Sequence, residues 1–290
     1  MKKIIYFHIG YGKAGSTYLQ NLFFSNNKFN PIHLRNRARN PLIINKNSIQ
    51  KIKSSYIKKK INVISDETFT SPFSQKSLDI FKRLDYSIKL LKKFFDIKFI
   101  VVIRNQKNWY ISRYSQNPLK FLYIDKKFYS YKNAIKKIFE PKNIKKIEKI
   151  RDNNNYYKMM MFLKKRVKKE NFKFLVFEDL AKNEKFFLKE LEIFLKKKNI
   201  FNKGIKKIDK NIKYETQKIK NYYLPKIKFN KFFFLVKNSG LILTIKIFFF
   251  NKFLLPNLND NAYLIHKFYF SSNKKISILI NKNLKKYNYF

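Results

Sequence analysis

Short apolar runs alternate with longer segments of helical period from residue 4 to residue 180. Four runs predict buried strands, the last with an acidic end: Ile4–Ile9, Ile61–Ile64, Phe99–Ile103 and Phe172–Leu180. Helical patterns extend between them over Asp79–Phe95 and Asp152–Lys168. Strands that alternate with long helices predict an α/β fold, in which a parallel sheet carries helices on both faces. The 290 residues suit one sizeable domain of this kind.

A glycine-rich loop directly follows the first run. Three of the chain's five glycines lie within six residues there: Gly10, Gly12 and Gly15. The next residues, Ser16–Phe24, have the pattern of a helix. Because backbone N–H groups and the helix dipole converge at such a junction, the segment predicts an anion site, to which Lys13, Ser16 and Thr17 add a charge and two hydroxyls. The alternative is a tight turn in which Ser16 is the helix N-cap.

The loop differs from that of a nucleotide triphosphatase. In such a loop a lysine stands directly before the hydroxyl residue. Here Gly10 and Gly15 have the right separation, but Ser16 takes the lysine position and Lys13 lies inside the loop. Asp66 is the single candidate for a magnesium-binding acid at a strand end. The pattern therefore indicates a phosphate group, with little support for a metal-bound triphosphate.

The segment H-I-G-Y-G-K-A-G-S-T-Y-L-Q, residues 8–20, resembles the 5'-phosphosulfate-binding loop of sulfotransferases, above all of the bacterial and carbohydrate-acting branches. The resemblance implies a P-loop-like three-layer sandwich and the donor 3'-phosphoadenosine 5'-phosphosulfate, with adenosine 3',5'-bisphosphate as product. It implies that the donor is held by the loop residues Gly12, Lys13, Ala14, Gly15, Ser16 and Thr17. Lys13 would offset the charge that develops on the leaving phosphate oxygen.

A second motif follows the most apolar strand. Arg104 stands at the strand's end and Ser112 eight residues later, within R-N-x-x-x-W-x-x-S-R-Y. In sulfotransferases an arginine and a serine at this spacing bind the 3'-phosphate, and a guanidinium does offer phosphate a planar fork. The alternative is a surface cation and a solvated helix serine. The position at the carboxyl end of a strand favours the phosphate site, because ligands of open α/β sheets bind there.

The acid pair Asp66-Glu67 follows the Ile61–Ile64 run. By resemblance to the same branch, Glu67 is the general base that takes the acceptor's proton, and Asp66 orients it or competes with it. The alternative for Glu67 is an acid that compensates the dipole at a helix N-terminus. His8 is a further candidate base, since other sulfotransferases use a histidine, although a packed strand residue suits its position better.

The match to the family pattern extends to the chain's end. Glu178 and Asp179 resemble an E-D-L segment, in which we interpret Glu178 as structural, and Tyr269–Leu284 with Tyr287–Tyr289 resembles a closing helix and an aromatic end. The prediction is one domain over 1–290, with a donor-binding core at 1–200, a variable segment at 201–260 and a closing part at 261–290.

Composition limits the chemistry further. The absence of cysteine excludes disulfides and thiolate sites, and His8, His33 and His266 have no ligand spacing, so no metal is expected. The formal net charge is +48, and lysine-rich, glycine-poor usage is typical of an AT-biased coding sequence. The positive electrostatic field of this charge attracts anions. No nucleic-acid-binding motif is found in the sequence, however, so no specific nucleic-acid partner is expected.

No signal peptide is predicted, because the first apolar run is too short for one. The Phe-rich segment 232–255 is interrupted by lysine and asparagine and falls short of a membrane span. It predicts a pair of amphipathic helices that pack on the core or, alternatively, contact an anionic membrane. A cytoplasmic location follows as an expectation, with peripheral contact at the inner membrane face as its variant.

The prediction is thus a sulfotransferase that acts on a hydroxyl, or alternatively an amine, of a carbohydrate or glycolipid. A P-loop kinase or nucleotide hydrolase is the enzymatic alternative. The non-enzymatic alternative is a basic module that binds polyanions or membrane surfaces.

Overall fold

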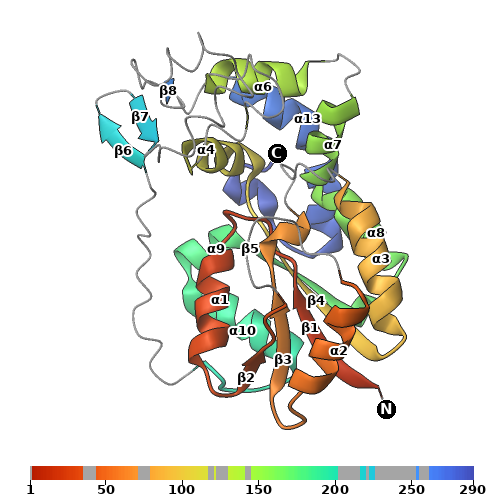
Figure 1. The fold of residues 1–290 in the computed structure, drawn as a ribbon. Helices are drawn as coiled ribbons and strands as arrows, with labels where there is room; N and C mark the ends of the chain where they lie inside the picture. Colours follow the sequence, from red (N-terminus) through yellow and green to blue (C-terminus); the bar gives the residue numbers. More distant parts are fainter. Residues whose placement is uncertain are drawn as a thin grey trace.

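Five parallel strands form the central sheet, in the order β2-β3-β1-β4-β5 (Figure 1). Their bounds are β1 Lys3–His8, β2 Phe29–Pro31, β3 Ile61–Ser65, β4 Phe95–Ile103 and β5 Phe172–Val176. The computed structural model describes residues 2–34, 44–70, 79–116, 121, 130–140, 145–201, 216–219, 222–225, 253–254 and 261–290. The predicted α/β fold with a parallel sheet is confirmed.

β1 and β4 lie at the centre of the sheet, where Tyr6 of β1 pairs with Val63 of β3 on one side and with Lys98 of β4 on the other. Phe99 to Ile103 in β4 are all fully buried. A parallel strand covered on both faces is expected to be continuously apolar, which is why this run is the clearest strand signal in the sequence.

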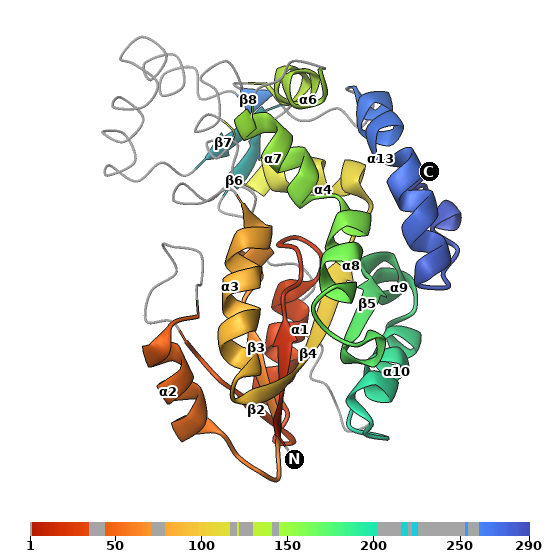
Figure 2. The ribbon, with the colours of Figure 1, turned by 90° about the vertical axis from the view of Figure 1, so that its right-hand side faces the viewer.

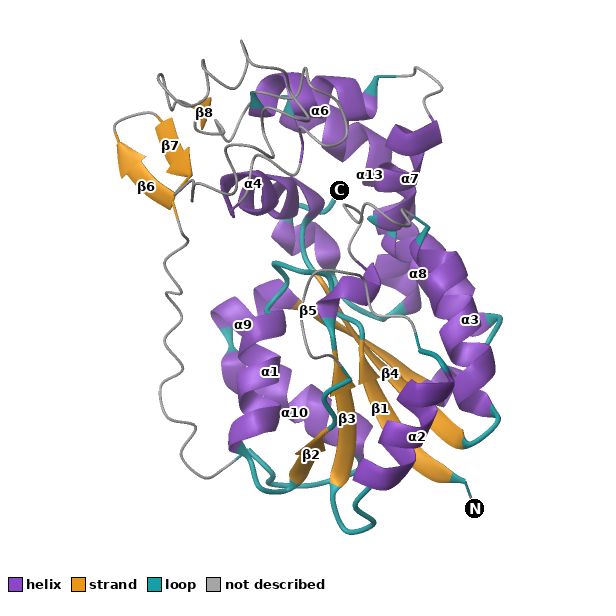
Figure 3. Ribbon diagram, viewed as in Figure 1, coloured by secondary structure: helices purple, strands orange, loops and turns teal. Residues whose placement is uncertain are grey.

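Helices cover both faces of the sheet (Figures 1 and 3). One face carries α1 (Ser16–Ser25), α9 (Phe177–Lys182) and α10 (Glu184–Leu195). The other carries α2 (Lys46–Ser55), α3 (Ile80–Lys92) and α8 (Tyr156–Lys164). This arrangement follows from right-handed crossovers, because the chain moves outward from β1 to β2 and then back across the sheet to β3, β4 and β5.

A group of helices lies beyond the carboxyl ends of the strands (Figure 2). It consists of α4 (Gln106–Gln116), α6 (Tyr131–Phe139), α7 (Lys145–Asn153) and the long α13 (Ala262–Leu279), which packs against α4, α6 and α8. Three 3-10 helices complete the described helices: η1 (Glu67–Thr70), η2 (Lys169–Asn171) and η3 (Leu284–Tyr287). A small antiparallel sheet pairs β6 (Thr216–Ile219), β7 (Tyr222–Pro225) and β8 (Phe253–Leu254).

Several element bounds differ from the prediction. The helix predicted over Asp79–Phe95 ends at Lys92, and Phe95 already begins β4, because Phe95 and Ile97 are buried in the sheet. The helix predicted over Asp152–Lys168 is two helices. They separate at Asn154 and Asn155, where the Asn155 side chain caps α8 by accepting a hydrogen bond from the Lys158 N–H.

The later segments differ as well. The strand predicted over Phe172–Leu180 ends at Val176, so Glu178 and Asp179 lie in the first turn of α9. The closing helix begins at Ala262, before the predicted Tyr269, and ends at Leu279. The segment 232–255 lies outside the described residues except for Phe253 and Leu254, which form a strand and not a helix. The predicted division of the chain at 200 and 260 stays a prediction.

Candidate functional site

The loop between β1 and α1 is a tight turn that ends at a left-handed glycine. The Ala14 N–H donates to the Tyr11 carbonyl at 2.9 Å. Gly15, with φ 80°, is the N-cap of α1 and makes no side-chain cap bond, a conformation that glycine adopts at little cost. Ser16 is therefore the first helical residue and not the N-cap. Its hydroxyl donates back to the Tyr11 carbonyl at 3.2 Å, and Thr17 beside it is exposed.

Two carbonyls of this loop accept hydrogen bonds from the segment that follows β4. The Trp109 indole N–H donates to the Gly12 carbonyl at 2.6 Å, and Arg104 Nη1 donates to the Lys13 carbonyl at 2.7 Å. A trans peptide unit directs its N–H opposite to its carbonyl, so the Trp109 bond turns the Lys13 N–H away from the indole. The loop and the strand-end arginine, predicted separately as phosphate sites, thus lie in direct contact.

Each loop glycine lies against a different side chain. A Cβ at Gly10 would be 2.5 Å from His8 Nε2, and one at Gly12 would be 3.3 Å from Glu67 Oε2. A Cβ at Gly15 would be 3.0 Å from Leu180 of α9. The glycines thus permit strand, acid and helix to approach the loop backbone closely, as their clustering in a glycine-poor sequence predicts.

Asp66 and Glu67 have different surroundings. Asp66 Oδ1 accepts hydrogen bonds from the Thr68 N–H at 2.8 Å and the Thr68 hydroxyl at 2.6 Å, so this carboxylate caps η1. Glu67 is the carboxylate that faces the loop at Gly12. Burial lowers the pKa of the Arg113 guanidinium, and the negative charge of Glu67 opposes that shift, so the two charges lie within electrostatic reach of each other.

His8 is enclosed within the sheet. Its ring is fully buried, and Nδ1 hydrogen-bonds the Ser65 hydroxyl at 2.7 Å. Nε2 has no hydrogen-bond partner among the described residues. Burial lowers the pKa of His8 to about 3, so the imidazole is neutral near pH 7. This environment is that of a packed strand residue, and it gives the ring no exposed edge from which to reach an acceptor.

Arg104 lies between the end of β4 and the start of α4, and Ser112 lies within α4. The Arg104 guanidinium stacks on the Phe177 ring of α9, with Cζ 4.7 Å from the ring centroid. The backbone carbonyl of Arg104 accepts a hydrogen bond from the Tyr156 hydroxyl at 2.6 Å. Ser112 lies in α4 and is half-buried, and its hydroxyl makes no hydrogen bond within the described part of the chain. The structure therefore gives Arg104 a fixed place beside the loop, while the role of Ser112 stays a prediction.

Aromatic rings pack within and against the loop, and sequence reasoning did not find these contacts. The buried ring of Tyr11 meets that of Tyr156 edge-on at 4.9 Å, and the Tyr11 hydroxyl has no partner among the described residues. Trp109 is 1% exposed. The sequence signals were present, since Tyr11 stands between two glycines and Trp109 stands in the arginine motif. Nothing local, however, indicates which atoms they contact.

The described residues include neither a metal-binding cluster nor a helix that could cross a membrane. No group of three histidine or acidic side chains in the described ranges is placed to bind a metal ion. Among the described helices, none combines the length and the apolar character that crossing a membrane requires.

Comparisons with known proteins concern the family and the fold of the chain. The model of the sulfotransferase domain family matches residues 6–231. A sulfotransferase structure from Alicyclobacillus acidocaldarius is similar with a TM-score of 0.53 and 11% identity, covering 98% of each chain. The sulfotransferase domain from the curacin biosynthetic pathway aligns over 68% of this chain and 75% of its own, with a TM-score of 0.37 and 14% identity. No curated protein sequence matches the chain.

Proposed function

Because the chain belongs to the sulfotransferase domain family, we propose that it transfers a sulfuryl group from 3'-phosphoadenosine 5'-phosphosulfate to a hydroxyl of a carbohydrate or glycolipid. Membership makes it an enzyme of sulfuryl transfer, and the family uses this donor. The carbohydrate acceptor rests on the resemblance of residues 8–20 to the carbohydrate-acting branches.

One contact supports the donor site most directly. Arg104, from the end of β4, donates to the carbonyl of Lys13 in the loop. A donor with a phosphate at each end of its ribose needs two anion sites at a short, fixed separation. A loop at a helix N-terminus joined to a strand-end guanidinium meets that need, because backbone N–H groups bind one phosphate and the arginine fork the other.

In this proposal the loop from Gly12 to Thr17 holds the 5'-phosphosulfate. Ala14 is fully buried and its N–H donates to the Tyr11 carbonyl, so it shapes the turn, whereas the half-buried Lys13 contributes a charged side chain. As the bond between sulfur and the phosphate oxygen breaks, negative charge grows on that oxygen, and the ammonium of Lys13 offsets it.

Glu67 is proposed as the general base. The acceptor oxygen forms a bond to sulfur while the bond from sulfur to the phosphate oxygen breaks, and the acceptor's proton passes to the Glu67 carboxylate. Its position against Gly12 supports this role, because it lies beside the loop that holds the sulfuryl group. Asp66 is already engaged as a cap by Thr68.

Calorimetric titration tests the donor class. Adenosine 3',5'-bisphosphate is expected to bind saturably and more tightly than ATP with magnesium. Tighter binding of ATP with magnesium would indicate a P-loop kinase or hydrolase instead. Binding of any polyanion with equal affinity, and with no preference for the adenosine ligand, would indicate a basic surface module.

Replacement of Lys13 tests the catalytic claim. Lys13→Ala is expected to lower transfer of labelled sulfate at least about 100-fold, the order found when one charge-stabilising group is removed. Lys189→Ala, in an exposed position of α10, removes the same net charge and is the matched control. Equal activity in the two variants would overturn the role given to Lys13.

A further inference from the structure

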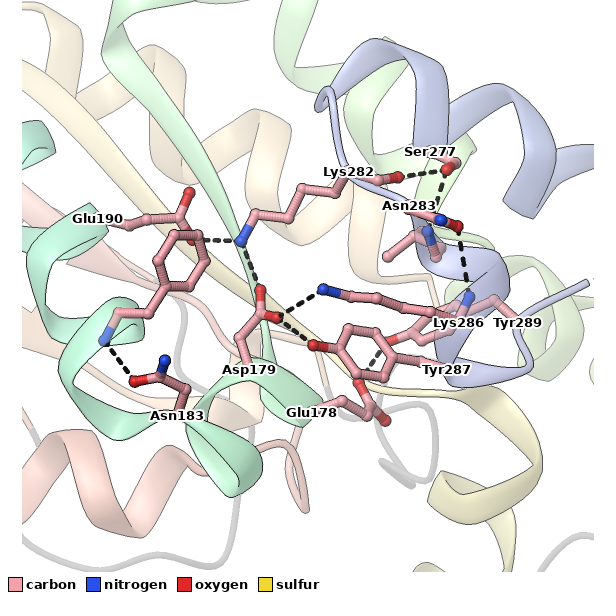
Figure 4. A network of polar contacts seen from close by, with 12 residues as sticks. Glu178, Asp179, Asn183, Glu190, Ser277, Lys282, Asn283, Lys286, Tyr287 and Tyr289 are labelled. Carbon is pink, nitrogen blue, oxygen red and sulfur yellow. Dashed lines mark hydrogen bonds and ion pairs between the residues drawn. The ribbon is translucent and has the colours of Figure 1, made fainter.

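The chain's C-terminal tail, residues 282–290, packs against Glu178 and Asp179 of α9 (Figure 4). Its backbone also accepts hydrogen bonds from Asn105, the residue after Arg104. The tail contains η3 and ends in an aromatic pair, of which Tyr289 is 1% exposed. Figure 4 shows its side chains directed toward Glu178, Asp179 and Glu190.

Charged contacts fasten the tail to α9 and α10. The Lys282 ammonium lies between two carboxylates, those of Asp179, at 2.5 Å from Oδ2, and Glu190. The Tyr287 hydroxyl donates to Asp179 Oδ1 at 2.5 Å. Because the Asp179 side chain is only 3% exposed, these bonds are shielded from water and fix the tail in one position.

A second set of bonds leads from the tail to Asn105. The Tyr289 hydroxyl donates to Glu178 Oε2 at 2.8 Å, and Glu178 Oε1 accepts from the Asn105 N–H at 2.9 Å. The Asn105 side chain donates to the carbonyls of Asn288, at 2.7 Å, and Tyr287, at 3.2 Å. The residue that follows Arg104 is thus bonded to the tail both directly and through Glu178.

Asn105 also connects to the other half of the phosphate motif. Its side-chain oxygen accepts from the Asn108 N–H at 3.1 Å and so caps the start of α4, the helix that contains Ser112. Arg104 precedes Asn105 directly and Ser112 lies seven residues after it. Any displacement of Asn105 therefore changes the separation and the angle between these two groups.

Electrostatics link Glu178 to the same place. Burial raises the pKa of Glu178, while the bonds from the Asn105 N–H and the Tyr289 hydroxyl and the charge of Arg104 oppose that rise. A buried carboxylate needs such donors to stay ionised, and Tyr289 is the one that the tail supplies.

We propose that the C-terminal tail, through Tyr289, Glu178 and Asn105, positions Arg104 for the donor's 3'-phosphate. This inference rests on the proposed function, because it needs Arg104 to bind that phosphate. Tyr289 and Glu178 are then positioning residues, which act on the ligand through the backbone at Asn105. In this proposal the tail affects donor binding indirectly, by fixing the position of Arg104.

Tyr289→Phe tests the proposal, because it removes one hydroxyl and keeps the ring. Affinity is measured by calorimetry for adenosine 3',5'-bisphosphate and for adenosine 5'-phosphate, which lacks the 3'-phosphate. The bisphosphate is expected to bind about tenfold more weakly, the order of one lost hydrogen bond to a charged group, with the monophosphate unchanged within about twofold. Thermal unfolding of the variant verifies that it is folded.

The matched control is Tyr287→Phe, which removes another tail hydroxyl, one that bonds Asp179 and not Glu178. It is expected to leave the ratio of the two affinities unchanged. An unchanged ratio in Tyr289→Phe, or an equal loss for both ligands, overturns the proposal. An equal change of ratio in both variants also overturns it, because the tail would then act only by its general packing.

A third variant distinguishes a failure of this inference from a failure of the proposed function. Arg104→Lys is expected to reduce the preference for the bisphosphate, because an ammonium cannot form the bidentate fork. If Arg104→Lys keeps the full preference, the 3'-phosphate site itself is misassigned. If it loses the preference while Tyr289→Phe keeps it, the site stands and the role of the tail is wrong.

Discussion

Gly12 is the residue at which three parts of the chain meet. Its carbonyl accepts from the Trp109 indole of α4, and a Cβ at this position would be only 3.3 Å from Oε2 of the Glu67 carboxylate in η1. A single peptide unit is thus oriented by one neighbour and lies beside the proposed base. The geometry of the proposed site therefore depends on individual backbone atoms of the loop.

Glu67→Gln is expected to lower the rate of sulfuryl transfer by about 10² to 10⁴, because the amide cannot take the acceptor's proton. The affinity for adenosine 3',5'-bisphosphate is expected to stay within about twofold of that of the natural chain, because binding of this ligand does not involve the proton transfer. Steady-state transfer of labelled sulfate and calorimetry give the two numbers.

Asp66→Asn is the matched control for that variant, because asparagine also caps a helix by accepting from the Thr68 N–H. It is expected to keep activity within about threefold. Full activity of Glu67→Gln, or an equal loss in both variants, would show that Glu67 is not the base.

His8 makes stability depend on pH. Its folded pKa of about 3 lies below the ordinary value of 6.5, so the folded state resists the proton that the unfolded chain accepts. The contribution of His8 is complete above about pH 6.5 and is lost progressively as the pH falls toward 3. Between pH 7 and pH 5 the loss from this one group is about 2 kcal/mol.

His8→Asn isolates this effect, because asparagine can still hydrogen-bond the Ser65 hydroxyl and has no proton to gain. Urea unfolding at pH 7 and pH 5 is the measurement. The free energy of unfolding of the natural chain is expected to fall by about 2 kcal/mol more than that of the variant. Identical pH slopes for the two proteins would contradict the buried neutral histidine.

At the scale of elements, the tail depends on ionic contacts with α9 and α10. Lys282 contacts two carboxylates whose side chains are 3% and 14% exposed, those of Asp179 and Glu190. Glu190 keeps a second partner in Lys173, at 3.1 Å. The Lys282 ammonium is therefore one of the contacts that hold the tail on these two helices.

Lys282→Met is expected to lower the free energy of unfolding by about 3 kcal/mol, because it removes the cation nearest to two buried carboxylates and leaves Asp179 only the more distant Lys286, at 3.9 Å. Lys285→Met, at an exposed position of the same tail, is the control, and its effect is expected to stay within about 0.5 kcal/mol. Urea denaturation of both variants at pH 7 provides the comparison. Equal stabilities would show that the ion pairs contribute nothing to holding the tail.

At the scale of the whole molecule, the formal charge of +48 produces a field that attracts any anion. Affinity for adenosine 3',5'-bisphosphate is accordingly expected to fall about tenfold between 50 and 500 mM NaCl, as the field is screened. The uncharged nucleoside adenosine, measured at the same salt concentrations, is the control and is expected to show no such loss. Salt-independent binding of the bisphosphate would mean that the overall charge makes no contribution at the site.

The family relation is also a property of the whole chain. The sulfotransferase domain model matches from β1 into the variable segment, and the Alicyclobacillus structure aligns over 98% of each chain at 11% identity. At that identity the structural likeness concerns the fold. It is consistent with the order β2-β3-β1-β4-β5, which brings the loop after β1 and the end of β4 side by side.

The sequence by itself determined the features that local patterns encode. Continuous apolar runs identify buried parallel strands, and clustered glycines before a helical pattern identify the loop, because both depend on residues near one another in the chain. These patterns were enough to predict the sheet, the loop and the strand-end arginine. The three-residue β2 was missed, because Phe29–Pro31 is too short to show a period.

Only the tertiary structure decided which side chains meet. Trp109 with Gly12, Glu67 with Gly12, and Asn105 with the carbonyls of Tyr287 and Asn288 join residues far apart in the sequence. Such contacts depend on strand order, crossover direction and side-chain orientation, which no local pattern records. The fold could therefore be predicted from the sequence, whereas the contacts that link the tail to the segment carrying Arg104 became known only from the tertiary structure.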